Sequence, residues 1–551
     1  MASPERLAEA MRLLSSGAWH EAETAARLDM EDDPADPHAA LLLGLAVAAM
    51  GEAARAAPYL NHVAAMRPEA DHPCLDLARL KPPLPPALVA RQFRACRHLA
   101  PQDARLRLRF AEFLLDSDQA AEAETILSVG PDSVARHHLM GLAHAEQSQF
   151  QSAIRDFQRA VALSPEAAES WSNLGMVLKV DGRFAEATAA HDRAVLLAPN
   201  NPRFRVNRAV ALLKAGQWER AWQDYEARLE LAGAPAIDPT RLMPSLRPGN
   251  SLVGMTILAL HEDGFGDTLQ FLRYLPLLAE RGARVVACVP PVLARVMQTV
   301  PGVAEIVTDS RRLPPHDYVC PMFSLPRVFG TSLSRASGMP LPRASGTTVG
   351  TIPPVPDVVL DPALVRRWAG HLPRGGRLRV GLVWAGQARP SLPGFGTLDR
   401  RRSAGLAAFE PSFSVPGVVF VSLQAGPAAR QVRPPALTLC DPMPDVGDFA
   451  DTAAIIAGLD VVVSVDTSVV HLAGLVGKPV FLLDRYDGCW RWLSGRADSP
   501  WYPHLTIFRQ EQPGDWSGAM ARAAASLETM ARDHRRLASV SGGVREHAFV
   551  A

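Results

Sequence analysis

Residues 255–271, MTILALHEDGFGDTLQF, decide the fold of the C-terminal part of this 551-residue chain. Met255–Leu260 is a continuous apolar run with the length of a buried strand. Gly264 and Gly266 mark a turn, and Thr268–Arg281 then repeats leucine at helical spacing. A buried strand that leads through a glycine turn into a helix begins a β-α-β unit, and it predicts a parallel sheet.

The alternation of strands and helices continues in two series. The first series adds a predicted strand at Arg284–Val289, a helix after Pro291 and a short strand around Glu305–Val307. The second series adds strands at Leu378–Trp384, Val418–Leu423, Val461–Val465 and Pro479–Leu483, with helices at Ala450–Leu459 and from Ser468. We therefore expect two Rossmann-like α/β domains, over residues 251–350 and 375–551, with ligands at the carboxyl ends of the strands. The Pro, Gly, Ser and Thr-rich segment Arg335–Asp357 predicts a mobile connection between them.

An internal repeat occupies residues 1–230. Prolines recur at a spacing of 34 residues, from Pro165 to Pro199, and the apolar pattern before them recurs with the same period. This pattern resembles the tetratricopeptide repeat in its period and in two kinds of small residue. The first helix of a unit carries a glycine, Gly141 or Gly175, and the second carries an alanine, Ala153, Ala187 or Ala221. Such hairpins bury their apolar faces only by stacking, so we expect an α superhelix whose concave face binds a protein partner. A structural arm or an oligomerisation element is the alternative, and the proline-rich residues 231–250 are a predicted linker.

Composition excludes several classes of protein. Lys plus Arg and Asp plus Glu are both 57, and a zero formal charge argues against a nucleic-acid-binding protein. Six scattered cysteines without a CxxC pair argue against disulfides or a zinc site and favour a reducing compartment. The first residues lack the pattern of a signal peptide, and the most apolar stretch, Ala39–Met50, is too short for a transmembrane segment. We therefore expect a cytoplasmic protein.

Asp267 is the leading candidate for a catalytic group. It follows the glycine turn at the start of a helix, where the amino end is electropositive and where ligands bind in open α/β sheets. An aspartate at this position also suits a helix cap, and the sequence leaves both roles open.

Two other segments are candidates for binding an anion. Asp466, Thr467 and Ser468 lie between a strand and a helix, and His471 follows one turn later, as a ligand contact or as a structural histidine. The segment Asp399–Ser403 could hold phosphates through its arginines, or it could be a solvated basic loop.

Together these stretches resemble the ADP-heptose–lipopolysaccharide heptosyltransferase-like glycosyltransferases, in a variant fused to tetratricopeptide repeats. The resemblance lies in GFGDTLQFLRYLPLL, LRVGLVWAG, the DRRRS segment, GDFADTAAIIAGLDVVVSVDTSVVHLAGLVGKPV and WRWLSGRADSPWYP. It implies a B-type glycosyltransferase fold, with Asp267 as catalytic base. It also implies a set of residues that bind the nucleotide-sugar: Gly264, Gly266, Gln270, Trp384, Gly386, Arg400, Arg402, Ser403, Gln424, Asp466, Thr467, Ser468 and His471.

The resemblance further implies an inverting transferase that needs neither a metal nor a cofactor beyond its nucleotide-sugar substrate. The repeat array favours a protein acceptor, similar to flagellin. Two alternatives stay open: transfer to lipopolysaccharide or another envelope glycan, and a non-catalytic scaffold with a degenerate transferase domain. The sequence specifies neither the donor sugar and its nucleotide nor the acceptor.

Overall fold

A computed structural model describes residues 4–66, 89–90, 93–94, 97, 102–333, 351–387, 395–409, 415–435 and 437–546. Most of the predicted mobile connection Arg335–Asp357 lies outside these residues. The chain divides into two compact units, residues 1–177 and 178–551, and the boundary falls within helix α10 (Ala168–Val180).

The first unit consists of helical hairpins, as the repeat predicts. Close pairing within a hairpin depends on small residues: a Cβ on Gly141 would lie 2.8 Å from the ring of Phe157, and one on Gly44 would lie 2.8 Å from Leu60. Pro165 follows the end of its hairpin, where a proline cannot continue the helix. The helices of the hairpins are α1 (Pro4–Ser16) and α2 (Trp19–Asp32), α3 (Pro37–Ala49) and α4 (Ala53–Met66), α6 (Ala104–Asp116) and α7 (Ala120–Leu127), and α8 (Val134–Glu146) and α9 (Phe150–Leu163).

The second unit begins with the last helices of the repeat. These are α11 (Phe184–Leu197), α12 (Pro202–Lys214) and α13 (Trp218–Tyr225), followed by the 3-10 helices η2 (Glu226–Glu230) and η3 (Pro239–Arg241). Trp218 stacks on Trp501 at 5.2 Å, and Trp222 meets Trp490 edge to face at 5.5 Å. The last repeat hairpin therefore shares one apolar core with the α/β region.

The first sheet is parallel, with strand order β3-β2-β1-β4. One face packs on the helices that follow β1 and β2, while the other packs on the segment around Ile237. The strands are β1 (Thr256–Leu260), β2 (Arg284–Cys288), β3 (Val303–Val307) and β4 (Tyr318–Pro321). The helices are α14 (Phe265–Phe271), η4 (Leu272–Tyr274), α15 (Leu275–Glu280), α16 (Pro291–Met297), η5 (Met322–Ser324) and α17 (Leu325–Val328).

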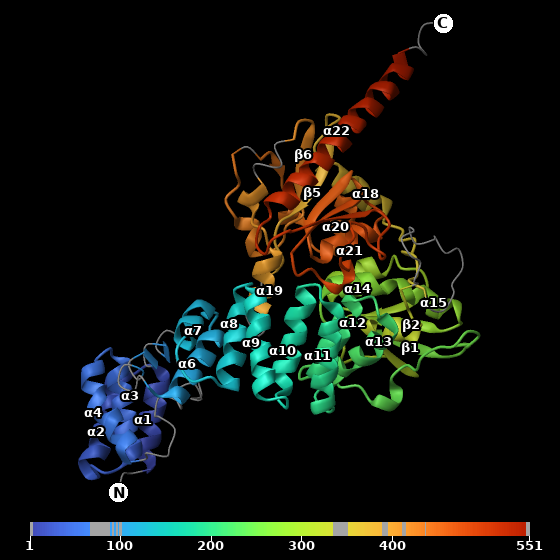
Figure 1. The fold of residues 1–551 in the computed structure, drawn as a ribbon. Helices are drawn as coiled ribbons and strands as arrows, with labels where there is room; N and C mark the ends of the chain where they lie inside the picture. The colour runs from blue at the N-terminus through green and yellow to red at the C-terminus, as the bar shows by residue number, and fades with distance from the viewer. Residues whose placement is uncertain are drawn as a thin grey trace. The chain divides into compact units, whose positions relative to one another are not determined.

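The second sheet is also parallel, with strand order β10-β9-β8-β5-β6-β7. Helices α20 and α21 cover one face and α22 covers the other, and α22 then continues beyond the sheet (Figure 1). The strands are β5 (Leu378–Val383), β6 (Val418–Ser422), β7 (Leu439–Cys440), β8 (Val461–Val465), β9 (Val480–Asp484) and β10 (Leu505–Arg509). The helices are α18 (Pro362–Ala369), α19 (Phe395–Arg402), η6 (Leu406–Phe409), η7 (Pro427–Arg430), η8 (Met443–Asp445), α20 (Phe449–Ala457), α21 (Ser468–Leu475), η9 (Trp490–Trp492) and α22 (Ser517–Glu546).

The predicted fold class, a helical repeat array followed by two Rossmann-like α/β domains, is confirmed. One local prediction was wrong. The single helix over Thr268–Arg281 is divided into α14, η4 and α15, because Pro276 has no N–H to continue the helical hydrogen bonds. The basic segment Asp399–Arg402, for which a phosphate-binding role and a solvated loop both stayed open, is helical and ends α19. Among the described helices, none is long and apolar enough to span a bilayer.

Candidate functional site

The main candidate site is a cavity of about 480 Å³ at the carboxyl ends of both sheets. It lies where the loop after β1 enters α14 and the loop after β8 enters α21. It is lined by Tyr225, Asp263, Gly264, Phe265, Gly266, Asp267, Phe323, Gly386, Gln387, Arg402, Asp466, Thr467, Ser468, His471, Arg485, Cys489 and Arg491.

Asp267 lines this cavity and also caps a helix. Its Oδ2 accepts a hydrogen bond of 3.0 Å from the backbone N–H of Gly264, the N-cap of α14. Burial raises the pKa of Asp267 to about 6; Arg491 opposes this shift, while Asp263 and Asp466 add to it. The capping role that the sequence left open is confirmed, and the same carboxylate lines the cavity, where a catalytic role stays a prediction.

Arg491 is the partner of Asp267 that sequence reasoning did not select. It lies in η9, between β9 and β10, and its guanidinium donates to Asp267 Oδ1 and to Gln270 Oε1. The guanidinium also lies 4.5 Å from the centre of the Trp490 ring. Burial disfavours its charge, but the neighbouring Asp267 carboxylate raises the net pKa of Arg491 above its ordinary value. The motif Trp490-Arg491-Trp492 belongs to one of the stretches that carry the resemblance, but no local pattern pointed to its contact with Asp267.

Helices α14 and α21 meet at their amino ends because Gly266 has no side chain. A Cβ there would lie 2.8 Å from His471 Cδ2 and 3.3 Å from Ser468 Cα. Thr467 is the N-cap of α21, and its hydroxyl lies 3.2 Å from Ser464 Oγ. The candidate residues Asp466, Thr467 and Ser468 thus line the cavity at a helix amino end, which favours an anion.

His471 is buried beside this helix end. Its Nδ1 lies 2.9 Å from the hydroxyl of Tyr502, and its ring stacks on Trp492 at 5.5 Å. Burial lowers the pKa of His471 well below its ordinary value, and Arg491 and Arg273 lower it further. His471 is therefore neutral at pH 7 and contributes a hydrogen-bonding ring to the cavity wall, without a positive charge.

The segment after β5 contributes Gly386 to the cavity, and the end of α19 contributes Arg402. A Cβ on Gly386 would lie 2.3 Å from Arg402 Nε, so a larger residue there would require the guanidinium of Arg402 to shift. Arg402 pairs with Asp399 at 2.7 Å and donates to the carbonyl of Gln387 at 2.9 Å. Ser403 accepts a hydrogen bond of 3.2 Å from the Gly386 N–H and does not itself line the cavity.

Five of the predicted binding residues lie outside the cavity lining: Gln270, Trp384, Arg400, Ser403 and Gln424. Arg400 is exposed on α19. Gln270 is fully buried behind Arg491, and among the described residues its Nε2 has no hydrogen-bond partner. Gln424 accepts hydrogen bonds from the N–H groups of Trp384 and Ala385, at 3.0 and 2.9 Å. Gln424 and the buried Trp384 thus brace the ends of β5 and β6.

A second cavity of about 530 Å³ adjoins the first. The two share Phe265, Gln387, Thr467 and Ser468 in their linings. Gln424 lines the second cavity, together with the start of α20 and the apolar side chains of Val446 and Phe449. A ligand with a charged centre and a flat apolar end could therefore occupy both cavities across the amino end of α21.

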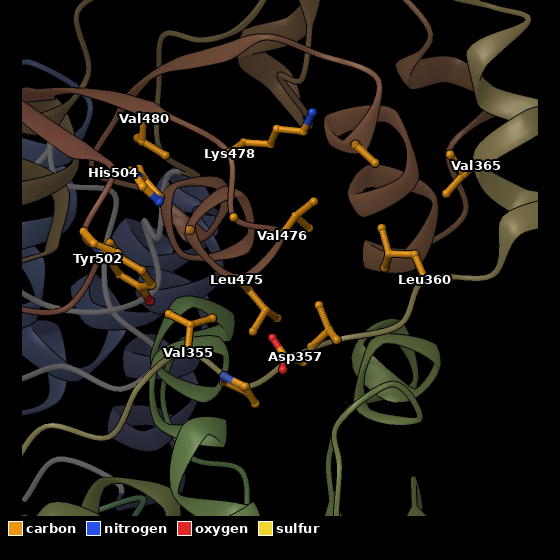
Figure 2. A pocket seen from close by; sticks show the side chains of 16 residues that line it. Val355, Asp357, Leu360, Val365, Leu475, Val476, Lys478, Val480, Tyr502 and His504 are labelled. Carbon is orange, nitrogen blue, oxygen red and sulfur yellow. The ribbon is translucent and has the colours of Figure 1, made fainter. Parts of the chain in front are cut away.

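A third cavity, also of about 530 Å³, is lined by residues 355–365 and by the region from α21 to β9 (Figure 2). None of the predicted site residues lines it. Its wall includes Tyr502, the partner of His471.

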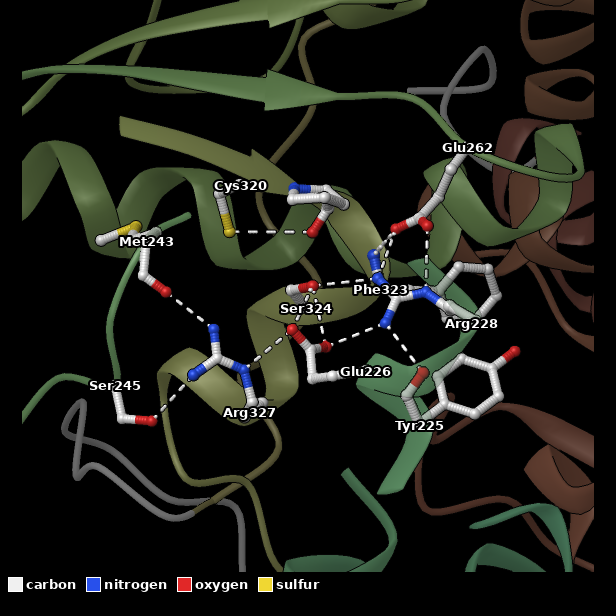
Figure 3. A network of polar contacts seen from close by, with 11 residues as sticks. Tyr225, Glu226, Arg228, Met243, Ser245, Glu262, Cys320, Phe323, Ser324 and Arg327 are labelled. Atoms are coloured by element: carbon white, nitrogen blue, oxygen red, sulfur yellow. Dashed lines mark hydrogen bonds and ion pairs between the residues drawn. The ribbon is translucent and has the colours of Figure 1, made fainter. Parts of the chain in front are cut away.

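The last turn of the repeat array holds the loop that enters α14 (Figure 3). Arg228 of η2 binds both carboxylate oxygens of Glu262 at 2.8 and 3.0 Å, and it also contacts Glu226 at 2.8 Å. Glu262 accepts a further 2.9 Å hydrogen bond from the backbone N–H of Phe323. Because Glu262 immediately precedes Asp263 in the cavity wall, this network positions the loop that leads into α14, the helix of Asp267.

The structure adds several aromatic and cationic residues to the predicted site, among them Tyr225 and Arg485. Tyr225 ends α13, so the repeat array supplies part of the cavity wall. Arg485 pairs with Asp487 at 2.7 Å and lines the cavity opposite α14. Within the described part of the chain, no group of three His, Cys, Asp or Glu side chains could hold a metal ion.

No family model matches the chain. Protein FlbA of Caulobacter vibrioides is 26% identical over 483 residues, which cover 81% of this chain and 76% of FlbA. The chain is similar to FlbA over most of its length. A crystal structure of MamA aligns with 28% of this chain and 92% of its own, at 21% identity and a TM-score of 0.26. A glycosyl transferase family 9 structure from Veillonella parvula aligns with 52% of this chain and 98% of its own, at 13% identity and a TM-score of 0.36.

Proposed function

We propose that this chain is a glycosyltransferase that moves a sugar from a nucleotide-sugar donor to a hydroxyl acceptor. One observation carries the proposal: Asp267 and the amino end of α21 line the same cavity, at the carboxyl ends of two parallel sheets. The first sheet thus provides a carboxylate for the acceptor, and the second provides an anion-binding helix end for the donor.

In the proposed reaction Asp267 removes the proton of the acceptor hydroxyl as its oxygen attacks the anomeric carbon. The bond from that carbon to the phosphate oxygen breaks, the nucleoside diphosphate leaves with the electron pair, and the configuration inverts. Burial favours this role, because a carboxylate whose pKa is raised to about 6 is a stronger base than an exposed aspartate.

We assign stabilisation of the leaving diphosphate to the amino end of α21 and to the guanidinium groups of Arg402 and Arg485. The proposed mechanism requires no metal and no cofactor. The second cavity, which adjoins α21, is the proposed place of the nucleoside.

We further propose a protein acceptor, such as a flagellin, that the repeat array recruits in the cytoplasm. The support is the stack of helical hairpins, an architecture whose extended surfaces suit a peptide chain. An envelope glycan is the alternative acceptor, and transfer to a purified protein compared with a lipopolysaccharide core decides between them.

The contacts of Asp267 favour a second candidate function, a scaffold that binds a nucleotide-sugar without turnover. Both carboxylate oxygens are engaged, Oδ1 by Arg491 and Oδ2 by the Gly264 N–H. A catalytic base must release one of these contacts when the acceptor binds. Donor binding without product formation would favour the scaffold.

The test is Asp267→Asn in the full-length chain. Asparagine keeps the acceptor oxygen that caps α14 but cannot take a proton, so we expect transfer to fall by roughly 10²–10⁴-fold with donor binding retained. A panel of nucleotide-sugars screened by thermal shift identifies the donor, and product formation with that donor measures turnover.

The matched control is Asp361→Asn. Asp361 caps α18 through a 2.8 Å hydrogen bond from the Ala363 N–H and does not line the cavity. We expect this variant to transfer sugar at the wild-type rate. If Asp267→Asn kept full activity, Asp267 would be a helix cap and not the catalytic base.

A further inference from the structure

Lys214 connects the last repeat hairpin with the turn that carries Arg491. It ends α12 and is buried, with 9% of its surface exposed. Its Nζ donates three hydrogen bonds, to the carbonyls of Gly488 at 2.8 Å, Cys489 at 3.2 Å and Leu493 at 3.0 Å. An ammonium group has three donors, and here all three are used on one turn.

The geometry of residues 488–493 depends on contacts from outside the turn. Leu493 adopts φ +51°, a left-handed conformation that a leucine rarely takes unless its surroundings hold it there. Its carbonyl accepts from Lys214 and also from Arg509, at 2.8 Å. The turn is thus held from the repeat side and from β10 together.

This turn places the guanidinium of Arg491 against Asp267. Arg491 lies between Cys489 and Leu493, two of the residues whose carbonyls Lys214 binds. A shift of the turn therefore moves the charge that opposes the raised pKa of Asp267.

We infer that Lys214 is a positioning residue through which the repeat array sets the charge environment of the catalytic carboxylate. The inference rests on the proposed function, and it deepens that function by making the last repeat hairpin part of the catalytic apparatus. Arginine cannot replace this lysine equivalently, because a planar guanidinium directs its donors outward in a fork, while three carbonyls converge here on one nitrogen. The chain uses lysine at only 4 of its 57 Lys and Arg positions.

The experiment compares Lys214→Met and Lys214→Arg with the wild-type full-length chain. The first measurement is hydrogen–deuterium exchange of the peptide that covers residues 486–495. We expect faster exchange in both variants, because the carbonyls of Gly488, Cys489 and Leu493 lose a buried donor or its geometry.

The second measurement is the pH profile of turnover with the donor found in the nucleotide-sugar panel. The charged groups around Asp267 are Arg491, Asp263 and Asp466. If Arg491 withdraws, the repulsion from Asp263 and Asp466 is no longer opposed, and the pKa of Asp267 rises. We expect the acidic limb of the profile to move upward by roughly 0.5–1 pH unit.

Lys478→Met is the matched control. Lys478 also donates to a backbone carbonyl, that of Leu459 at 2.8 Å, but it lies outside the lining of the two candidate cavities. We expect its exchange over 486–495 and its pH profile to match the wild type.

Unchanged exchange over residues 486–495 together with an unchanged pH profile would overturn the inference. If Lys214→Met lowers the melting temperature, Lys214→Arg, which keeps the charge, decides the question by the same two measurements. If the wild-type chain shows no turnover, the proposed function fails. In that case exchange alone decides: faster exchange supports the role of Lys214 in holding the turn, and unchanged exchange rejects it.

Discussion

Two opposing effects act on the pKa of Asp267. Burial raises its pKa to about 6, and the contact with Arg491 limits that rise. In the proposed reaction only the ionised carboxylate can accept the proton of the acceptor hydroxyl, so the active fraction would grow as the pH passes upward through about 6.

We therefore expect the kcat/KM of transfer to increase between pH 5 and pH 7 and then to level off, with a midpoint of about 6. The measurement is a series of initial rates in buffers of constant ionic strength. The Asp361→Asn variant should give the same curve. A midpoint near 4, the range of an exposed aspartate, would contradict the assignment of Asp267 as the base.

At the scale of elements, the 3-10 turn η2 and the loop after β1 are joined by a buried ion pair. The side chains of Arg228 and Glu262 are 10% and 8% exposed, and their closest atoms are 2.8 Å apart. Burial disfavours the charge of Arg228, but the two glutamates around it hold its net pKa above the ordinary value. Each charge is therefore tolerated because the other is present.

We expect Arg228→Met to lower the free energy of unfolding by about 3–5 kcal/mol, since Glu262 would be left as a buried charge. Denaturation in urea measures the change, and a second substitution, Glu262→Gln, should recover part of it. The matched control is Arg284→Met, which removes an exposed pair with Glu305 and should cost less than about 1 kcal/mol. Equal losses of unfolding free energy in the two arginine variants would show that the buried pair stabilises the protein no more than the exposed pair does.

The sequence predicted elements better than contacts. The strands β1, β2, β5, β6, β8 and β9 lie where continuous apolar runs predicted them, because a strand buried on both faces leaves such a run. The short strand β4, Tyr318–Pro321, and strand β10, Leu505–Arg509, were missed, since a tyrosine, a proline and two polar residues interrupt their patterns.

The candidate site was only partly predictable, for a similar reason. The two helix ends were found from glycine and small polar residues that are close in sequence, and they do converge in the structure. The pairing of Asp267 with Arg491 spans 224 positions, and that of Lys214 with Gly488 spans 274. Contacts of this kind arise from tertiary packing and leave no local periodicity. Arg400 and Arg402 looked equivalent in the sequence, yet the helical turn of α19 exposes the first and brings the second to the cavity.

At the scale of the whole molecule, the limits of the repeat do not coincide with the limits of the compact units. The repeat pattern continues to about residue 230, whereas the second unit begins at residue 178. Trp222 shows what this means for folding: it is 2% exposed, packs on Phe271 and Trp490, and donates through Nε1 to the carbonyl of Thr331 at 3.0 Å.

We expect Trp222→Ala to destabilise the second unit by about 3–5 kcal/mol, since it removes a large buried side chain. The loss should appear as a lower melting temperature and a smaller thermal shift with donor. The control is Trp171→Ala, in the first unit, where the indole is half-buried and donates to the carbonyl of Pro165 at 3.0 Å. Equal donor-induced shifts in the two variants would argue against a shared core of repeat and α/β region.

The network around Arg228 bears on how chains of this kind could be recombined. A chimera that exchanged residues 1–230 for another repeat array would separate Arg228 from Glu262 and Lys214 from the turn at 488–493. A chimera whose junction lies upstream of α11 would keep both pairs. If the repeat array recruits the acceptor, as proposed, new acceptor preferences are best engineered by replacing the earlier hairpins alone.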